Sequence, residues 1–183
     1  MLGRQWWMVV VGTRQLLRHI YNYREAAANR QLAASEEDVK WTDTHKPNAN
    51  HKAVETFAAV EHTIKHEIKV SRRDWDKHEP KMWSRVQGIT DEELVAFNVA
   101  GGDLVLIRNG ATSYGTILLG KIKIPAVEDA YVHVRILKGE VDGKDDIKFH
   151  SIFTNEGNKD VDGHPTTWQA VQTLATPLDF FNE

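Results

Sequence analysis

The sequence predicts an α+β domain in which N-terminal helices pack on a curved, mainly antiparallel six-stranded meander, as a cone-like sheet or partial barrel. Three observations predict this fold. Apolar residues recur at helical spacing over residues 50–70, and from about residue 93 they alternate with polar ones. Turns rich in glycine and asparagine separate the alternating stretches. A helical half followed by a run of strands is typical of the α+β class.

The composition limits the classes of function. With 183 residues, 41% of them hydrophobic, the chain is long enough to bury a core. It has no cysteine, which excludes disulfides, thiolate catalysis and cysteine-ligated metals and favours a soluble, intracellular, cytoplasmic protein. A net charge of −3 is not the basic footprint of a nucleic-acid-binding domain. The apolar run at residues 6–11 is too short for a membrane span, so no integral membrane segment is predicted.

Two parts of the chain differ in charge. Residues 1–35 are predicted to form a basic extension with a helix over 13–34, and residues 36–183 a single α+β domain that begins with a loop. Arginines without any acidic residue in the first 24 positions are typical of mitochondrial targeting, which is the alternative location. A helix docked on the domain, or a plain extension, explains the same pattern. The arginines are Arg4, Arg14, Arg18 and Arg24.

The helical half is predicted to cover the sheet. One helix over residues 50–70 carries an apolar stripe that faces the core. Residues 74–86 are expected to form a short third helix or a packed loop, since Pro80 interrupts them. The tail at residues 176–181 is expected to pack on the domain. The stripe consists of Val54, Phe57, Ala58, Ile64 and Ile68, and the apolar residues of the tail are Leu178, Phe180 and Phe181.

The strand half is predicted from alternation and turns. Asn109-Gly110 is expected to be a two-residue hairpin turn, because both central positions of a type I′ turn need a positive φ. At the first strand, Thr90 and Glu93 form a capping box that would make residues 91–99 helical. The alternation and the glycine pair that follows favour a strand. The six predicted strands are residues 94–99, 104–108, 113–124, 130–137, 147–154 and 166–173.

One face of the predicted sheet is polar. Alternation in residues 130–137 places Val132, Val134 and Ile136 on a dry face that receives the helix, and the polar side chains on the other. A flat sheet would leave the polar face in solvent, whereas a curled one would make it line a pocket. The order of elements is similar to that of cone-shaped nuclear-transport-factor-like folds and of small ligand-binding barrels. The polar residues are Tyr131, His133 and Arg135, with His150 and Asn98 from other strands.

These residues suggest a small-molecule site. Histidine exchanges protons near neutral pH, so His133 and His150 are the predicted catalytic acid and base of a lyase or isomerase type of proton transfer. Tyr131, Arg135 and Asn98 are predicted to bind an anionic or carbonyl-bearing ligand. The alternative is a non-catalytic domain that binds another protein. A homo-oligomer is left open.

Two patterns resemble metal sites but are incomplete. His62 and His66 lie one helical turn apart, yet Lys65 stands between them and the glutamate of the zinc-protease motif is absent. Residues 158–163 resemble the opening of a calcium loop, but Gln169 replaces the bidentate glutamate at the twelfth position, so a hairpin turn is predicted there. The sequence therefore predicts no cofactor and no metal.

Overall fold

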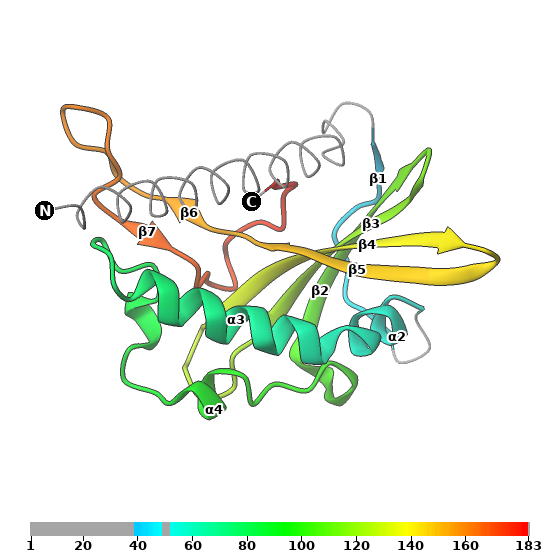
Figure 1. Cartoon of the computed structure of the whole chain (residues 1–183), viewed down its shortest axis with the longest axis horizontal. Coiled ribbons are helices and arrows are strands. Elements are labelled where there is room, and N and C mark those ends of the chain that lie inside the picture. Colours follow the sequence, from blue (N-terminus) through cyan, green and yellow to red (C-terminus); the bar gives the residue numbers. More distant parts are fainter. Residues whose placement is uncertain (1–38, 49–51, 183) are drawn as a thin grey trace, which may run out of the picture. The chain divides into compact units, whose positions relative to one another are not determined.

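The structure is a computed structural model that describes residues 39–48 and 52–182. They belong to one compact unit, Val39–Glu183. The predicted basic extension over residues 1–35, with its helix, lies outside the described residues. Among the helices described, none has the length and apolar character needed to cross a membrane. The main elements (Figure 1) are β1 (Lys40–Trp41), α2 (Lys52–Ala59), α3 (Glu61–Trp75), α4 (Asp91–Leu94), β2 (Leu104–Thr112), β3 (Gly115–Lys123), β4 (Tyr131–Val141), β5 (Lys144–Ile152), β6 (Asn155–Glu156) and β7 (Trp168–Gln169).

The α+β class is confirmed. The main sheet has five strands in the order β1-β2-β3-β4-β5, all neighbours are antiparallel, and β2 to β5 form a meander. The sheet is open, so the cone shape is not confirmed. The sixth strand is not confirmed either, because residues 166–173 supply only β7, which pairs with β6 in a separate sheet. The fifth strand is β1, in a segment that was expected to be a loop.

The predicted hairpin turn at Asn109-Gly110 is wrong. Both residues lie inside β2, where Asn109 pairs with Leu118 and Gly110 with Ile117, and the turn follows at residues 113–114. A Cβ atom at Gly110 would collide with the side chains of Val39 and Trp41 in the β1 segment. The glycine therefore lets another strand approach closely, a second common role of glycine within sheets.

The predicted strand over residues 94–99 is also wrong, and the capping box is confirmed. The Thr90 hydroxyl accepts the backbone N–H of Glu93 at 3.2 Å, and the Glu93 carboxylate accepts the backbone N–H of Thr90 at 2.8 Å. These bonds start α4, and a π-helical turn over Val99–Asp103 follows. Leu94 and Phe97 still reach the core. Alternating apolar residues are buried here without a strand because the chain turns.

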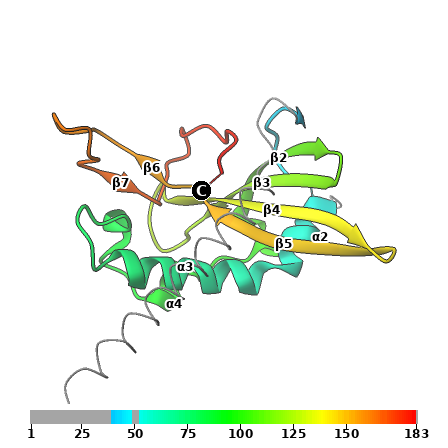
Figure 2. The same ribbon diagram turned by 45° about the horizontal axis from the view of Figure 1, so that its top comes forward.

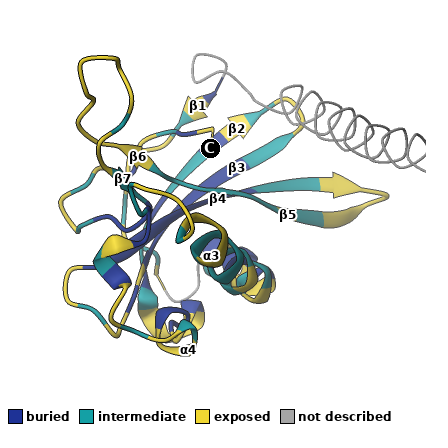
Figure 3. Cartoon of the chain, turned by 60° about the vertical axis from the view of Figure 1, so that its left-hand side comes forward, coloured by how far each residue is buried: buried dark blue, intermediate teal, exposed yellow. Residues whose placement is uncertain are grey.

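The helix predicted over residues 50–70 divides into α2 and α3 at Val60. Phe57, Ile64 and Ile68 are fully buried, as predicted, whereas Ala58 is exposed and Val54 only partly buried. The two helices cover the face of the sheet that carries Val132, Val134 and Ile136, so the predicted dry face is confirmed. In Figure 3 the buried residues concentrate along the middle of β2, β3 and β4, and the tip of the β4–β5 hairpin is exposed.

Two further predictions concern the connections. A short third helix or a packed loop was expected over residues 74–86. The segment contains a short 3₁₀ helix, Ser84–Val86, and its Trp83 is fully buried. The tail packs on the domain, because Leu178 and Phe181 are buried. Figure 2 shows the tail on the side of the sheet opposite α2 and α3. The sheet therefore lies between two covering layers.

Candidate functional site

The polar face of the sheet lies beneath the C-terminal end of the chain. We call residues 170–182 the C-terminal arm. The strand register pairs Lys121 with His133, and Leu119 with Arg135, so these side chains share one face of β3 and β4. The central side chains of this face are buried, so they are not open to solvent. Its buried polar members are Lys121, Tyr131, His133 and Arg135.

Lys121 holds the near part of the arm. Its side chain is fully buried, and its ammonium group donates to the carbonyls of Thr173 at 3.2 Å, Leu174 at 2.8 Å and Thr176 at 2.6 Å. The same ammonium group lies 5.7 Å from the ring centroid of Tyr131. Burial lowers the pKa of Lys121, because it disfavours the charged form, and the charge of Asp129 opposes that shift. A lysine thus uses all three donors on backbone oxygens.

Arg135 holds the far end of the arm. Only 2% of its surface is exposed. Its guanidinium donates to the carbonyl of Phe181 at 2.9 Å and to the side-chain oxygen of Asn182 at 2.8 Å, and lies 4.8 Å from the ring centroid of Phe180. Burial lowers the pKa of Arg135, and Tyr114 opposes the shift. The predicted ligand-binding arginine is therefore occupied by the protein's own neutral oxygens.

His133 is buried, and its Nε2 has no hydrogen-bond partner among the described residues. It is 1% exposed, and its ring stacks on Phe153 with centroids 5.7 Å apart. Burial, helped by the charge of Lys121, lowers the pKa of His133 to about 3. The imidazole is therefore neutral at physiological pH. A buried polar atom without a partner is destabilising, so Nε2 is a weak point of this face.

His150 lies at the other edge of the same region. A β-bulge in the β4–β5 pairing falls between Arg135 and Ile136, opposite the stretch that contains His150. The His150 ring is partly buried, with Nδ1 at 3.0 Å from the Ser151 hydroxyl. Burial lowers the pKa of His150 to about 4, and the positive charge of Arg135 adds to the shift. The electrostatic effect of Arg135 indicates that its guanidinium lies near the His150 ring.

The structure does not bring Asn98 to this face. Asn98 is exposed and precedes the π-helical turn, where its side-chain oxygen accepts the backbone N–H of Gly101 at 2.8 Å. Its own N–H donates to Asp103 at 2.7 Å. The next residue, Val99, donates to Glu61 of α3, which places this loop on the helical side. Asn98 thus supports a turn, and its ligand role stays a prediction.

Sequence reasoning missed Lys121 and the cover over the polar face. A signal for Lys121 exists, because Lys121 and Lys123 alternate with Ile122 and Ile124 and so share one face of their strand. The packing of the tail was predicted, but not its position. Nothing in the spacing of residues indicates which face a tail will cover, because that contact joins residues about 50 positions apart.

A shallow groove of about 370 Å³ lies elsewhere, beside β7. Trp168 forms part of it and stacks on Trp75, with ring centroids 5.5 Å apart. Trp75 is 39% exposed, and the indole N–H of Trp168 is buried and has no partner in the described part of the chain. The groove thus combines an aromatic surface with polar side chains and a proline. Its lining is Glu79, Pro80, Lys81, Ser84, Gln87, Thr167, Trp168 and Gln169.

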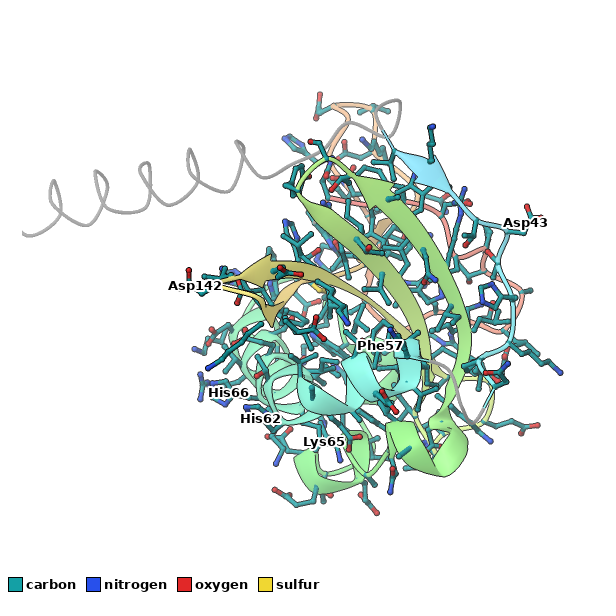
Figure 4. The ribbon with its side chains drawn as sticks, turned by 90° about the vertical axis from the view of Figure 1, so that its right-hand side faces the viewer. Asp43, Phe57, His62, Lys65, His66 and Asp142 are labelled. Carbon is teal, nitrogen blue, oxygen red and sulfur yellow. The ribbon has the colours of Figure 1, made fainter. Side chains whose placement is uncertain are left out.

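Among the residues that the structure describes, the two incomplete metal patterns gain no further ligand. His62 and His66 are exposed on the outer surface of α3, whereas Phe57 points toward the sheet (Figure 4). Asp160 accepts the backbone N–H groups of Asp162 and His164, both at 2.9 Å, as in the predicted turn. Within residues 39–48 and 52–182, no group of three or more His, Asp or Glu side chains could hold a metal ion.

Comparison with known proteins adds no relative. No protein-family model, no curated protein and no solved structure matches the chain. The geometry of the polar face and of the groove is therefore the basis of the proposed function.

Proposed function

We propose that this domain binds a small anionic molecule on the polar face of its sheet, at Arg135 and its neighbours. The observation that carries the proposal is a pair of buried cations that form no ion pair within the described part of the chain, although the charge of Asp129 acts on Lys121. Lys121 and Arg135 are at most 2% exposed, and their hydrogen bonds go to neutral oxygens. Among the described residues, no carboxylate forms an ion pair with either of them. Buried charges are normally paired, so this face is suited to an added anion.

The ligand class follows from the donors. A guanidinium presents parallel N–H groups that match a carboxylate or a phosphate. Nη1 of Arg135 now donates to both the Phe181 carbonyl and the Asn182 amide oxygen, two oxygens that an oxyanion would replace. The neutral His133 and the partly buried His150 adjoin the same region and can each donate one hydrogen bond.

Binding is favoured over acid–base catalysis. A catalytic histidine works best when its pKa lies near the working pH. The pKa values of about 3 for His133 and about 4 for His150 are well below that range. The assignment of these histidines as acid and base therefore stays a prediction, and we propose that they contact the ligand without transferring protons.

The test is titration of the full chain with inorganic phosphate and with oxalate at constant ionic strength, followed by calorimetry. Wild type should show saturable binding. Arg135→Met should weaken it at least about tenfold, because the bidentate donor is lost. Arg135→Lys covers the case in which the methionine variant does not fold, and should weaken binding while keeping the charge.

Lys77→Met is the matched control. Lys77 is an exposed cation just after α3 that pairs with Asp74 at 3.5 Å, so its removal changes net charge without touching the polar face. This variant should bind as wild type does. Equal, unsaturable responses from all four proteins would mean that the anions act only as screening salts, and the proposal would be rejected.

The alternative function, recognition of another protein, is supported by the groove beside β7. Exposed aromatic residues next to polar groups are common where extended peptides bind, and proline-rich segments dock on such surfaces. Trp75 and Trp168 provide the aromatic surface. A proline-rich peptide should change the tryptophan fluorescence of wild type and leave that of Trp75→Leu unchanged. Absence of any response in wild type would remove this candidate.

A further inference from the structure

The C-terminal arm is anchored very differently at its two ends. Its proximal part, residues 170–176, is bound by backbone hydrogen bonds. Gln172 and Tyr131 exchange two of them, at 2.7 Å and 3.0 Å, and the N–H of Leu174 donates to the Asp129 carboxylate at 2.8 Å. The three bonds from Lys121 are added to these. This part is effectively joined to β4.

The distal part, residues 177–182, lacks such bonds. Within the described chain, none of these six residues takes part in a backbone–backbone hydrogen bond. The ring of Phe180 lies 5.4 Å from that of Trp41, and the ring of Phe181 lies 5.2 Å from that of Phe153. Segments with few backbone hydrogen bonds open at lower free energy than the sheet they cover.

Within residues 39–48 and 52–182, the side-chain hydrogen bonds and the ion pair of the distal part involve two arginines. Arg135 binds Phe181 and Asn182, and Arg108 pairs with Asp179 at 3.5 Å, where the carboxylate is 71% exposed. Arg108 also lies 5.0 Å from the ring centroid of Trp41. Exposed ion pairs contribute little to stability, so this pairing does not prevent opening.

The two arginines are neighbours on the sheet. Arg108 of β2 pairs with Leu119 of β3, and Leu119 pairs with Arg135 of β4. They therefore flank one leucine on the same face, and their strands are separated by roughly 10 Å, twice the spacing of adjacent strands. Leu119 is fully buried and lies outside the helix-side core. Release of the distal part would uncover two guanidinium groups facing the same solvent region.

We propose that residues 177–182 form a latch, which opens at the Thr176–Pro177 junction while Lys121 keeps the proximal part in place. Pro177 has no N–H to bond to the sheet, so the junction is a natural point for the backbone to change direction. The open latch presents Arg108 and Arg135 to an anion with two acidic groups or one extended oxyanion. Its own oxygens and Asp179 occupy that position when it is closed. The latch rests on the proposed anion binding and regulates the same site.

The absence of cysteine in the chain allows a direct test of opening. Leu119→Cys places one thiol beneath the latch, and Val134→Cys places one at an equally buried position on the helix face. Thiol labelling at neutral pH should modify Leu119→Cys at least about tenfold faster, because local opening costs less than global unfolding. Equal labelling rates would show that both thiols are exposed only by global unfolding, and the latch would be rejected.

A second substitution connects opening to ligand binding. Adding Phe181→Ala should speed the labelling of Leu119→Cys and leave the labelling of Val134→Cys unchanged. The same substitution should tighten the binding of oxalate, because apparent affinity rises with the population of the competent state. Unchanged labelling with unchanged oxalate binding overturns the latch and leaves the proposed function standing. Faster labelling with no oxalate binding in any variant supports the latch and rejects the proposed function.

Discussion

The two faces of the five-stranded sheet are both covered, but by layers of opposite chemistry. On one face, aliphatic residues of β4 such as Val134 meet Phe57 and Ile64 of the helices, and packing holds the layers together. On the other, Lys121 and Arg135 bind oxygens of the C-terminal arm. A layer of helices that packs against a sheet through many side chains does not readily detach one part at a time. A cover attached by a few side-chain bonds can leave while the sheet remains, which is why we place the ligand site there.

The largest expected effect separates the two covers. Phe57→Ala should lower the free energy of unfolding by about 3–5 kcal/mol, because it opens a cavity in a core that cannot collapse. Phe181→Ala should lower it by less than about 2 kcal/mol, since the loss is limited to the free energy that closes the distal part of the arm. Urea denaturation measures both. Equal losses of unfolding free energy would show that the arm contributes to stability as the helix-side core does.

Lowering the pH should destabilise mainly the polar face of the sheet, which the C-terminal arm covers. The folded-state pKa of His133, about 3, lies below its unfolded value, so the unfolded chain takes up the proton first and stability falls as pH drops from about 6.5 toward 3. His133→Leu removes this group. Relative to wild type, the variant should gain about 2–3 kcal/mol between pH 6.5 and 4.5. Parallel stability profiles for the two proteins over that range would show that His133 titrates normally.

Removal of the buried Lys121 should test directly the hydrogen bonds between the polar face and the C-terminal arm. Lys121→Met leaves three carbonyl groups without their donor and should cost about 2–3 kcal/mol of unfolding free energy. Lys123→Met is the control, because Lys123 shares the face and is exposed, and its effect should stay within about 0.5 kcal/mol. If Lys121→Met leaves the free energy of unfolding unchanged, water has replaced the ammonium group as the donor to these carbonyls.

The smallest effect is expected at the edge of the arm. Asp179→Asn breaks an exposed ion pair with Arg108 and should change the free energy of unfolding by no more than about 0.5 kcal/mol. Raising the salt concentration should remove even that difference, since exposed pairs are screened. A larger or salt-independent loss would show that Asp179 fastens the arm, and that the two covers differ less than the contacts indicate.

Much of the sheet was predictable because alternation is a local property. The strands around residues 104–108, 113–124, 130–137 and 147–154 were recognised, with boundaries displaced by a few residues. The errors arose where two local signals conflicted. At Thr90 a helix forms in place of the strand that the alternation predicts, because the capping box satisfies the backbone N–H groups of Thr90 and Glu93 locally. At Gly110 the side chain of Trp41 approaches so closely that only glycine fits, and the Asn-Gly pair lies within a strand and not in a turn.

The candidate site was predictable only in part. Alternation alone placed Tyr131, His133 and Arg135 on one face, and the register confirms that they share it. Asn98 was grouped with them through a strand that does not form. The same alternation also places Lys121 on this face of its strand. Burial of the face, which sets the low pKa values of His133 and His150, came from the arm and could not be derived locally.

By itself, the sequence determined the α+β class, the dry face of the sheet, the core-facing helix residues and the packing of the tail, because each depends on periodicity within a short stretch. Only the tertiary structure decided what covers the polar face. That outcome depends on contacts between residues such as Lys121 and Thr173, which are far apart in the chain. Such contacts form when the loss of chain entropy is offset by burial and hydrogen bonding, and no local pattern records that balance.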